Sequence, residues 1–571
     1  MVANILANDI SIPVLIVGGG PVGLLGAVLL GKRGVGTLLV EKHANRLDAP
    51  KAHALNARSL EICTAAGLPM AAIHAAATSP KDGAVVRMVT SLVGEELGSL
   101  PYERQDEAIR ALTRWPLINI AQPRVEAIIE QAARTLPGVE IRRGYEWTGC
   151  VQQGDTVVST LVERATGQTS KVRSRYLIAA DGAGSGVRDH LGISMEGPHA
   201  LQSNMMIHFE ANLRHLVADR PAILYLLFGP GTNRTLIAYD IDKTWVLMHR
   251  CAANAKPEDF DEAVCRRLIF QAIGTTVPDL SIKGVRPWVM SAQVARFYRS
   301  SNAFLVGDAA HRFPPTGGLG LNTGFGDIDN LAWKLSATLS GYAGEGILDS
   351  YETERKHIAE INARQSLSNA MRMKVLTEVL GYGPDLSVDA ETFAARLADP
   401  QNRPKIDEAI QYQKGHFDSL RLQMGFAYGG ALDADDALPI CEFKPKAVAG
   451  SRLPHVALAD GRSSLDLVAR DEMTLFCGSR GGDWKTLLDH LGTPIALRQQ
   501  GVAFHCVGDF CEHTGIATNG AILVRPDGHI LAVAPGANGQ AVEGLRRALA
   551  QYLARTNDSV AKPHAANAAQ V

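Results

Sequence analysis

Short apolar runs alternate with helix-like segments along the first half of the chain, and this pattern predicts an open α/β sheet. Four largely apolar runs have the length of buried strands: residues 12–17, 37–40, 175–180 and 303–306. Small and apolar residues follow the first run. A helical repeat follows the last run, formed by Ile328, Leu331, Leu335 and Leu339. Because parallel strands are covered by helices on both faces, runs of this kind are typical of α/β domains.

The pattern changes further along the chain. Residues 191–285 alternate polar and apolar positions and predict a second, β-rich sheet, whereas residues 350–432 mostly follow helical spacing. From residue 453 to about 555 the expected order is strand, helix, strand, hairpin, helix. We expect these strands at residues 473–477, 502–507, 521–524 and 529–533, and the first helix at 484–491.

Composition and charge exclude several classes of protein. With 57 basic and 59 acidic residues among 571, the chain has no excess charge that would favour nucleic acid or an anionic membrane. Eight cysteines without a C-x-x-C pair favour a reducing compartment. No secretory signal or membrane-spanning run is apparent, so we expect a soluble, cytoplasmic protein. The irregular spacing of the histidines and cysteines at residues 505–513 does not predict a metal site.

A glycine-rich turn follows the first predicted strand. Gly18, Gly20 and Gly23 fit the pattern G-x-G-x-x-G between a strand and a helix, and Glu41 ends the next strand. Such glycines permit a tight turn, close approach of a pyrophosphate and close helix–strand packing, and the acid binds a ribose. This segment predicts a dinucleotide site. Because the chain contains only one such fingerprint, a second nucleotide would have to bind transiently across a shared surface.

Residues 307–322 form the most distinctive loop of the sequence. An acid at the end of a strand, Asp308, is followed by two prolines, a glycine cluster that includes Gly318, and the start of a helix. The glycines allow a flat ligand to lie against the main chain, and a helix N-terminus favours a ring that becomes anionic on reduction. A flavin fits these properties. Asp181, which ends the run at 175–180, is interpreted either as a further ligand-lining residue or as a local helix cap.

Taken in this order, the segments at 18–23, 181–188 and 307–322 resemble the single-component flavoprotein aromatic hydroxylases, the fold group of para-hydroxybenzoate hydroxylase. The resemblance covers about residues 12–400 and continues more weakly to 555. Within this group, residues 50–61 and 317–323 are most similar to the phenol-type hydroxylases. The resemblance implies an α/β protein with an FAD-binding Rossmann-like domain, an interleaved β-sheet substrate domain and a C-terminal thioredoxin-like domain.

The implied domain boundaries are as follows: an FAD-binding domain at 1–190 and 286–400, a substrate domain at 191–285 with part of 79–112, a helical linker at 401–440, the thioredoxin-like domain at 441–555 and a disordered tail at 556–571. Cys477 has no second cysteine at redox spacing, so disulfide exchange is not expected of the C-terminal domain. A structural or dimer-contacting role is expected instead, and hence a homodimer.

The resemblance also implies roles for individual residues around FAD. Asp308 and Gln122 would contact the ribityl chain from two sides, and the backbone at Leu321 and Asn322 would face the pyrimidine edge of the ring. Asp181 would line the cofactor channel. Pro315 would lie over the reacting edge with its carbonyl toward the substrate. Lys51 stands near the phosphates where relatives often have arginine, so it keeps the charge without the bidentate geometry.

The implied chemistry is oxygen transfer to a phenol. NADH or NADPH reduces the flavin, O2 adds to it, and the hydroperoxide transfers one oxygen ortho to the phenolic hydroxyl. His53 is the candidate base, although it is equally open to a purely structural interpretation. Asn119 occupies a pocket position where relatives have aspartate, and as an amide it cannot itself be a base. Tyr225, on an apolar strand, could contact the substrate or pack in the core.

The leading hypothesis is therefore an FAD- and NAD(P)H-dependent hydroxylase of a small phenolic substrate. Three alternatives remain at this stage. The substrate could be a polyketide or other fused phenol, the protein could be a flavin dehydrogenase or oxidase that inserts no oxygen, or it could bind FAD without catalysis.

Overall fold

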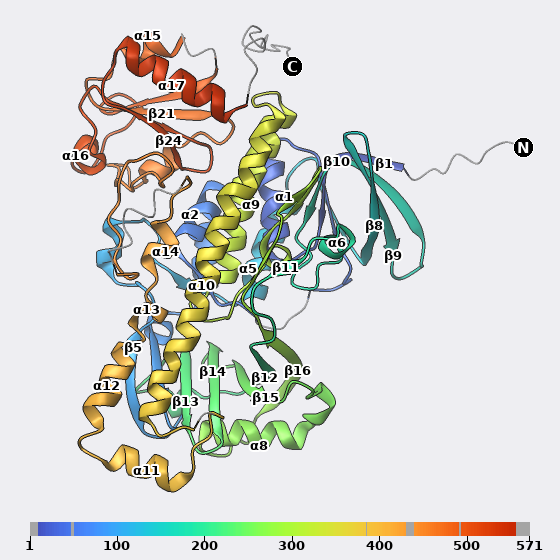
Figure 1. Cartoon of the computed structure of the whole chain (residues 1–571), viewed down its shortest axis with the longest axis vertical. Helices are drawn as coiled ribbons and strands as arrows, with labels where there is room; N and C mark the ends of the chain where they lie inside the picture. The colour runs from blue at the N-terminus through green and yellow to red at the C-terminus, as the bar shows by residue number, and fades with distance from the viewer. Residues whose placement is uncertain (1–8, 47–50, 384, 430–438, 490–492, 555–571) are drawn as a thin grey trace, which may run out of the picture.

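The structure of the protein is a computed structural model that describes residues 9–46, 51–383, 385–429, 439–489 and 493–554. Its first sheet contains five parallel strands that lie side by side, and four of them are the predicted apolar runs (Figure 1). The spatial order along the main path is β18 (Arg299–Ser300), β19 (Ala303–Leu305), β10 (Thr169–Ala179), β1 (Asp9–Val17), β2 (Thr37–Glu41) and β7 (Val139–Arg143). The antiparallel strands β8 (Tyr145–Gln153) and β9 (Thr156–Glu163) extend from β10. The α/β class is thus confirmed.

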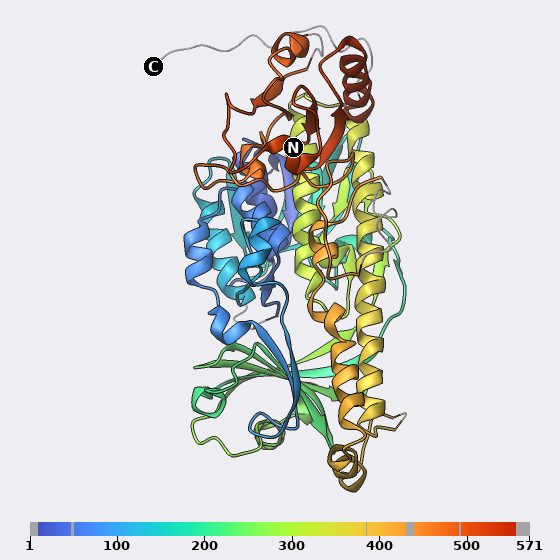
Figure 2. The same cartoon turned by 90° about the vertical axis from the view of Figure 1, so that its left-hand side faces the viewer.

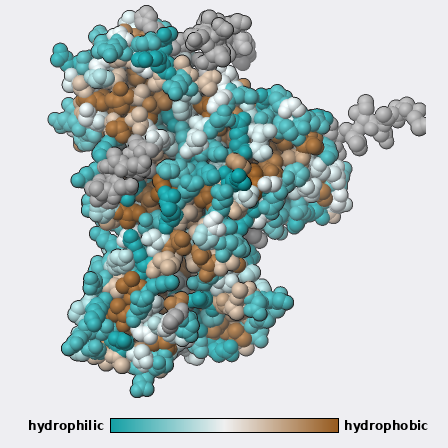
Figure 3. Space-filling view, in the orientation of Figure 1, coloured by the Kyte–Doolittle hydropathy of each residue, from teal (hydrophilic) through white to brown (hydrophobic). Residues whose placement is uncertain are grey.

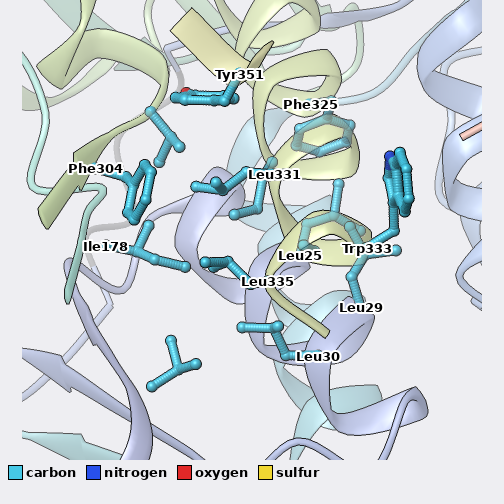
Figure 4. Close-up of a cluster of buried hydrophobic side chains, with 14 of the residues drawn as sticks. Leu25, Leu29, Leu30, Ile178, Phe304, Phe325, Leu331, Trp333, Leu335 and Tyr351 are labelled. Carbon is cyan, nitrogen blue, oxygen red and sulfur yellow. The ribbon is translucent and has the colours of Figure 1, made fainter. Parts of the chain in front are cut away.

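Two helices pack closely beside this sheet. Helix α1 (Pro21–Lys32) lies between the sheet and α9 (Leu319–Leu339), so nearly all its side chains are buried. Gly26 makes the approach possible, because a Cβ there would lie 2.8 Å from Ile328 Cγ1. Figure 4 shows the resulting core, in which Leu25 and Leu29 of α1 face side chains of α9 such as Leu331.

A second sheet lies below the first in Figures 1 and 2. Its order is β16 (Ser281–Met290), β12 (Gln202–Glu210), β15 (Thr244–Cys251), β14 (Thr232–Asp240), β13 (Leu224–Gly229), β4 (Val85–Val89) and β5 (Glu96–Pro101). Helix α8 (Glu262–Ile273) covers one face of this sheet, where a separate apolar cluster forms. The other face meets the helices α11 (Ala390–Ala398) and α12 (Arg403–Gln411) and residues around Ala54.

The 31-residue helix α10 (Asp349–Val379) runs along the length of the molecule from the C-terminal part to the second sheet (Figures 1 and 2). Short helices α13 (Lys414–Phe417) and α14 (Leu420–Met424) return toward the C-terminal part. Helical spacing over residues 350–432 is therefore confirmed for the described part of that range. Residues 430–438, part of the linker expected at 401–440, lie outside the described residues.

The C-terminal part forms a four-stranded sheet in the order β22 (Ile495–Gln499), β21 (Met473–Cys477), β23 (Ala521–Val524) and β24 (Ile530–Ala534), with α15 (Trp484–Leu488), α16 (Phe510–Thr514) and α17 (Gly539–Tyr552). Strands at 473–477 and 521–524 were predicted with these bounds. The strand expected at 502–507 is wrong: β22 pairs with β21 instead, and Val502 is 75% exposed. The predicted disordered tail at 556–571 lies outside the described residues.

Hydrophilic and hydrophobic residues are intermixed over most of the face seen in Figure 3. Within the described ranges, no helix combines the length and apolar character needed to cross a membrane.

Candidate active site

The glycine turn between β1 and α1 is shaped by close backbone contacts. Gly18 has φ +112°, and a Cβ there would lie 2.2 Å from the Ala180 carbonyl oxygen. A Cβ at Gly23 would lie 2.1 Å from the Gly18 oxygen, whereas Gly20 has no atom within 4 Å of its Cβ position. Gly18 and Gly23 are therefore required by the protein itself, and the open space beside Gly20 fits the approach of a pyrophosphate.

Glu41 is already held in place beside this turn. Its Oε2 accepts a hydrogen bond from Gly19 N at 2.8 Å, and its Oε1 accepts one from His43 N at 2.8 Å. A carboxylate has about four acceptor positions, so two remain for hydroxyl groups. The oriented acid at the end of β2 is what ribose binding requires.

Asp181 has a structural role in the loop after β10. It accepts hydrogen bonds from Ser185 Oγ at 2.5 Å and Val187 N at 3.1 Å. Ser185, and not Asp181, is the N-cap of α6 (Gly186–His190). Burial raises the pKa of the Asp181 carboxyl. The space above Gly182 and Gly184 is open, so this loop can receive a ligand along its backbone.

The loop that carries Asp308 rests on a buried carboxylate. Asp327 of α9 accepts hydrogen bonds from Gly307 N at 3.1 Å, His311 Nε2 at 2.8 Å and Arg355 Nε at 2.9 Å. Burial opposes ionisation of Asp327, but His311 and Arg355 outweigh it and lower its pKa. His311 thus serves the structure of this loop. Asp327 was missed, although an acid between Phe325 and Ile328 on an apolar helix was a usable signal.

Asn322 fixes the start of α9. Its side chain donates to Gly318 O and Ala54 O, and it accepts from Asn56 N and Ser59 Oγ, at 2.6–3.1 Å. The helix begins at Gly318 in a left-handed conformation, and no side chain caps its first amides, which include that of Leu321. These amides favour an anionic group. Asp308 Oδ1 lies 4.0 Å from the Cβ position of Gly320, so it faces the same helix start.

The candidate base His53 is oriented by Asn119. Strand β3 (Ala54–Leu55) pairs with β6 (Ile118–Asn119), and His53 Nδ1 lies 3.0 Å from Asn119 Oδ1. Asn119 Nδ2 donates to Gly83 O at 2.9 Å, which directs its oxygen to the histidine. Nδ1 of His53 is therefore the donor, and Nε2 carries the lone pair. Burial lowers the pKa of His53, so the neutral ring predominates at pH 7.

Two tyrosines that the sequence did not indicate lie against His53. The ring centroids of Tyr102 and Tyr239 are 5.5 Å and 5.9 Å from that of His53. Tyr239 donates its hydroxyl to Lys51 O at 2.6 Å. The Tyr102 hydroxyl lies 3.6 Å from the Cβ position of Gly318 and has no hydrogen-bond partner in the part of the chain that the structure describes. Tyr102 thus lies against both His53 and the start of α9.

The remaining predicted residues differ in their placement. Gln122 begins α5 (Gln122–Arg134), accepts from Ala52 N at 3.2 Å and donates to Glu126, so it adjoins the His53 segment. Lys51 is exposed at the same segment. Pro315 is exposed, and its carbonyl accepts from Gly318 N at 3.2 Å, which leaves one lone pair for a substrate.

Tyr225 is not part of this group. It is fully buried in the cluster between the second sheet and α8, and its hydroxyl donates to Arg220 O at 3.1 Å. Successive residues of a strand point to opposite faces, so Leu224 and Leu226, and not Tyr225, face the side where Ala54 and Tyr102 lie. The substrate-contact interpretation of Tyr225 is wrong, since the sequence alone does not indicate which face a strand turns to the site.

Contacts join these segments into one site. Val22 lies 3.2 Å from the Cβ position of Gly307, which brings the glycine turn to the Asp308 loop, and Gly318 adjoins Ala54. Along these contacts lie the open backbone at Gly20, the oriented Glu41, the uncapped start of α9 and the neutral imidazole of His53. Such a series fits a flavin-dinucleotide oxidoreductase, the class that the sequence predicts.

Comparison with known proteins agrees with this class. Residues 11–366 match the family described as FAD binding domain, and residues 446–556 match the family described as aromatic-ring hydroxylase, C-terminal. The chain is 31% identical to 2,4-dichlorophenol 6-monooxygenase of Cupriavidus pinatubonensis, over 97% of this chain and 98% of the relative. It is 33% identical to a putative polyketide hydroxylase of Streptomyces halstedii, over 91% and 92%.

Among solved structures, the flavin-dependent monooxygenase PieE in complex with FAD and substrate superposes with a TM-score of 0.89 at 31% identity, covering 96% of this chain and all of that one. The chain belongs to the FAD-dependent aromatic-ring hydroxylases. It is an FAD-dependent aromatic monooxygenase that uses O2 and a nicotinamide reductant. The alternatives without oxygen insertion and without catalysis are therefore set aside.

Proposed function

We propose that this enzyme hydroxylates a phenolic substrate ortho to the hydroxyl, with His53 Nε2 accepting the phenolic proton. One observation carries the proposal: Asn119 holds the proton on Nδ1 of a neutral, half-buried His53, so Nε2 is left as a base beside the start of α9. Removing the phenolic proton raises the electron density at the ortho carbon, which prepares the ring for electrophilic oxygen.

FAD held by these residues would, when reduced, activate dioxygen, which provides the oxygen atom that is transferred. The chain's own residues bind and orient. Gly20 and Glu41 would receive the nucleotide half, Asp308 and Gln122 the ribityl chain, and the backbone at Leu321 and Asn322 the ring edge. Lys51 would lie near the phosphates, Asp181 and its glycines along the channel, and the Pro315 carbonyl at the substrate.

The Tyr102 hydroxyl is a further candidate contact for the substrate oxygen. Its ring adjoins His53, it points toward Gly318, and burial raises its pKa, so it stays a hydrogen-bond donor at every pH at which the enzyme works. A base and a donor on one phenolic oxygen would together hold the substrate as its anion.

A fused, polyketide-type phenol is the second candidate substrate class. It is supported by relatives that are named polyketide hydroxylases at 33% and 29% identity. A single-ring phenol is supported by the two relatives named 2,4-dichlorophenol 6-monooxygenase, at 31% and 29% identity.

The test is a screen of single-ring and fused phenols for accelerated NAD(P)H oxidation, with labelled dioxygen and product identification. We expect one class to accelerate flavin reduction and to incorporate the label ortho to its hydroxyl. Hydrogen peroxide as the sole oxygen product with every phenol would refute the proposal. The same assay with NADH and NADPH assigns the reductant.

We also propose domain boundaries at residues 190, 285, 400 and 440 and a thioredoxin-like fold for the C-terminal sheet. A homodimer and a cytoplasmic location are proposed as well. The strand order β22-β21-β23-β24 with one parallel pair supports the thioredoxin-like fold. The eight cysteines, all free thiols, support a reducing compartment.

A further inference from the structure

The C-terminal sheet inserts one hairpin turn between the helices that hold the flavin loop. Arg525 follows β23, and its guanidinium donates to Glu354 of α10 at 2.7 Å and 3.0 Å and pairs with Asp527 in the same turn. Asp527 in turn accepts from the indole of Trp333 on α9 at 3.2 Å. In Figure 1 this sheet lies against the ends of both helices.

Glu354 lies at the centre of these contacts, and both of its carboxylate oxygens accept hydrogen bonds. Besides Arg525, its carboxylate receives Lys334 Nζ and Asn330 Nδ2 from α9, each at 2.7 Å, and the Tyr552 hydroxyl from α17 at 2.9 Å. The side chains of Arg525, Lys334 and Glu354 are at most 9% exposed. These neighbours lower the pKa of Glu354, although burial opposes this. Buried charges are costly unless paired, so this cluster tolerates little displacement.

The next residue of α10 connects this cluster to the flavin loop. Arg355 holds Asp327, the carboxylate on which Gly307 N and His311 rest. Arg355 also donates to the Tyr428 hydroxyl at 3.3 Å, and the Arg525 guanidinium lies 4.8 Å from the Tyr428 ring centroid. An unbroken series of buried contacts therefore runs from the C-terminal sheet to the backbone beside Asp308.

We propose that Arg525 is a positioning residue for FAD: the C-terminal domain, through Arg525 and Glu354, sets the placement of Arg355 and Asp327 and thereby the conformation of residues 307–313. The domain then shapes the cofactor site without touching FAD.

A second ion pair between the same two parts of the chain provides a matched control. Arg452 of the C-terminal part pairs with Glu61 of α2 (Ala57–Ala65), and both are as buried as Arg525 and Glu354. The other partners of Glu61 are Arg58 and Thr113. Arg58 also reaches the backbone carbonyl of Asp527 and the carboxylate of Asp329 on α9, but within the described residues neither Arg58 nor Arg452 is hydrogen-bonded to Glu354, Arg355 or Asp327. Arg452→Met therefore removes a comparable buried cation without breaking a contact of the Arg355–Asp327 route.

The experiment compares Arg525→Met, Arg525→Lys and Arg452→Met with the unmodified full chain, at a temperature at which all are folded. FAD affinity is measured by fluorescence titration of the apoprotein, and amide exchange in peptides spanning 303–313 is measured by mass spectrometry. Neither readout depends on hydroxylation, so failure here is distinct from failure of the proposed substrate chemistry.

We expect Arg525→Met to bind FAD about tenfold more weakly and to exchange at 303–313 about tenfold faster, in line with couplings of about 0.5–2 kcal/mol through packed networks. Arg525→Lys keeps the charge but not the bidentate geometry, so its FAD affinity and exchange rate should lie between those of the original protein and Arg525→Met. If Arg525→Met does not fold, Arg525→Lys is compared with Arg452→Met instead. Arg452→Met should leave both readouts within about twofold. Unchanged FAD affinity and exchange in the Arg525 variants, or equal changes in Arg452→Met, would overturn the proposal.

Discussion

Replacing His53 by alanine tests the proposed base most directly. The substitution removes Nε2 together with the hydrogen bond from Nδ1 to Asn119. It also removes ring contacts to Tyr102 and Tyr239, which should cost about 1–3 kcal/mol of unfolding free energy, as buried substitutions commonly do. No described contact of His53 reaches the glycine turn or Asp308, so FAD content should change little.

The expected loss of activity depends on the acidity of the substrate. A phenol with a pKa of about 10, like that of tyrosine, is ionised in about one molecule in 1,000 at pH 7. A base can therefore contribute up to about 10³, and general acid–base catalysis commonly contributes about 10²–10⁴. Because burial lowers the pKa of His53 and weakens it as a base, we expect a loss of about 10². For a phenol with a pKa of about 7, half is already ionised and the loss should be about threefold or less.

The assay measures kcat/KM for product formation across phenols of graded acidity, for the original enzyme and for His53→Ala, with FAD content and thermal stability as controls. The ratio of kcat/KM for the original enzyme to kcat/KM for His53→Ala should fall steadily as the phenol becomes more acidic. An equal loss at every acidity, or a loss that parallels FAD content, would assign His53 to structure and refute the reasoning.

Three further predictions follow from neighbouring observations. Asn119→Leu removes the acceptor that selects the His53 tautomer and should lower kcat/KM about fivefold with normal FAD content, since a hydrogen bond of this kind is worth about 1 kcal/mol; unchanged kinetics would contradict the tautomer assignment. Gly18→Ala, whose Cβ would meet the Ala180 oxygen, should lower the melting temperature and abolish FAD binding, whereas Gly20→Ala should fold normally and weaken only FAD binding, as calorimetry and titration would record. His416 is buried, its Nδ1 has no partner in the described residues, and burial lowers its pKa to about 3. Because the unfolded chain then takes up the proton first, stability should fall between pH 6.5 and about 3, by about 2 kcal/mol at pH 5. His416→Phe should flatten that part of the stability profile, and a profile identical to the original would count against the assignment.

Local sequence patterns were sufficient to identify residues at the nucleotide end of the site. Gly18, Gly23 and Glu41 could be identified because each role depends on neighbours in the βαβ unit itself. The strands at 473–477 and 521–524 could also be predicted from the sequence, because they are fully buried and therefore almost continuously apolar. The strand expected at 502–507 shows the limit, since exposed valines in a turn give the same signal.

The substrate end depended on contacts between distant segments. His53 and Asn119 were both candidates, but their 3.0 Å contact is produced by a two-residue ladder too short to leave a periodic signal. Tyr239 reaches His53 from β14 of the second sheet and Tyr102 from the residue after β5, and Asp327 acts through a loop that precedes it in the chain. Tyr225 was misplaced because alternation gives two faces and tertiary packing chooses between them.

The hydrogen bond from Tyr239 to the Lys51 carbonyl has a consequence for changing the substrate range of this enzyme. Tyr239 lies one residue before the end of β14, in the second sheet, and its hydroxyl bonds to the segment that carries His53. Mutations at this corner would move the proposed proton acceptor together with this part of the sheet. Directed evolution toward larger or smaller phenols should therefore accept changes at Leu224 and Leu226, which line the same side without holding that segment, far more readily than at Tyr239.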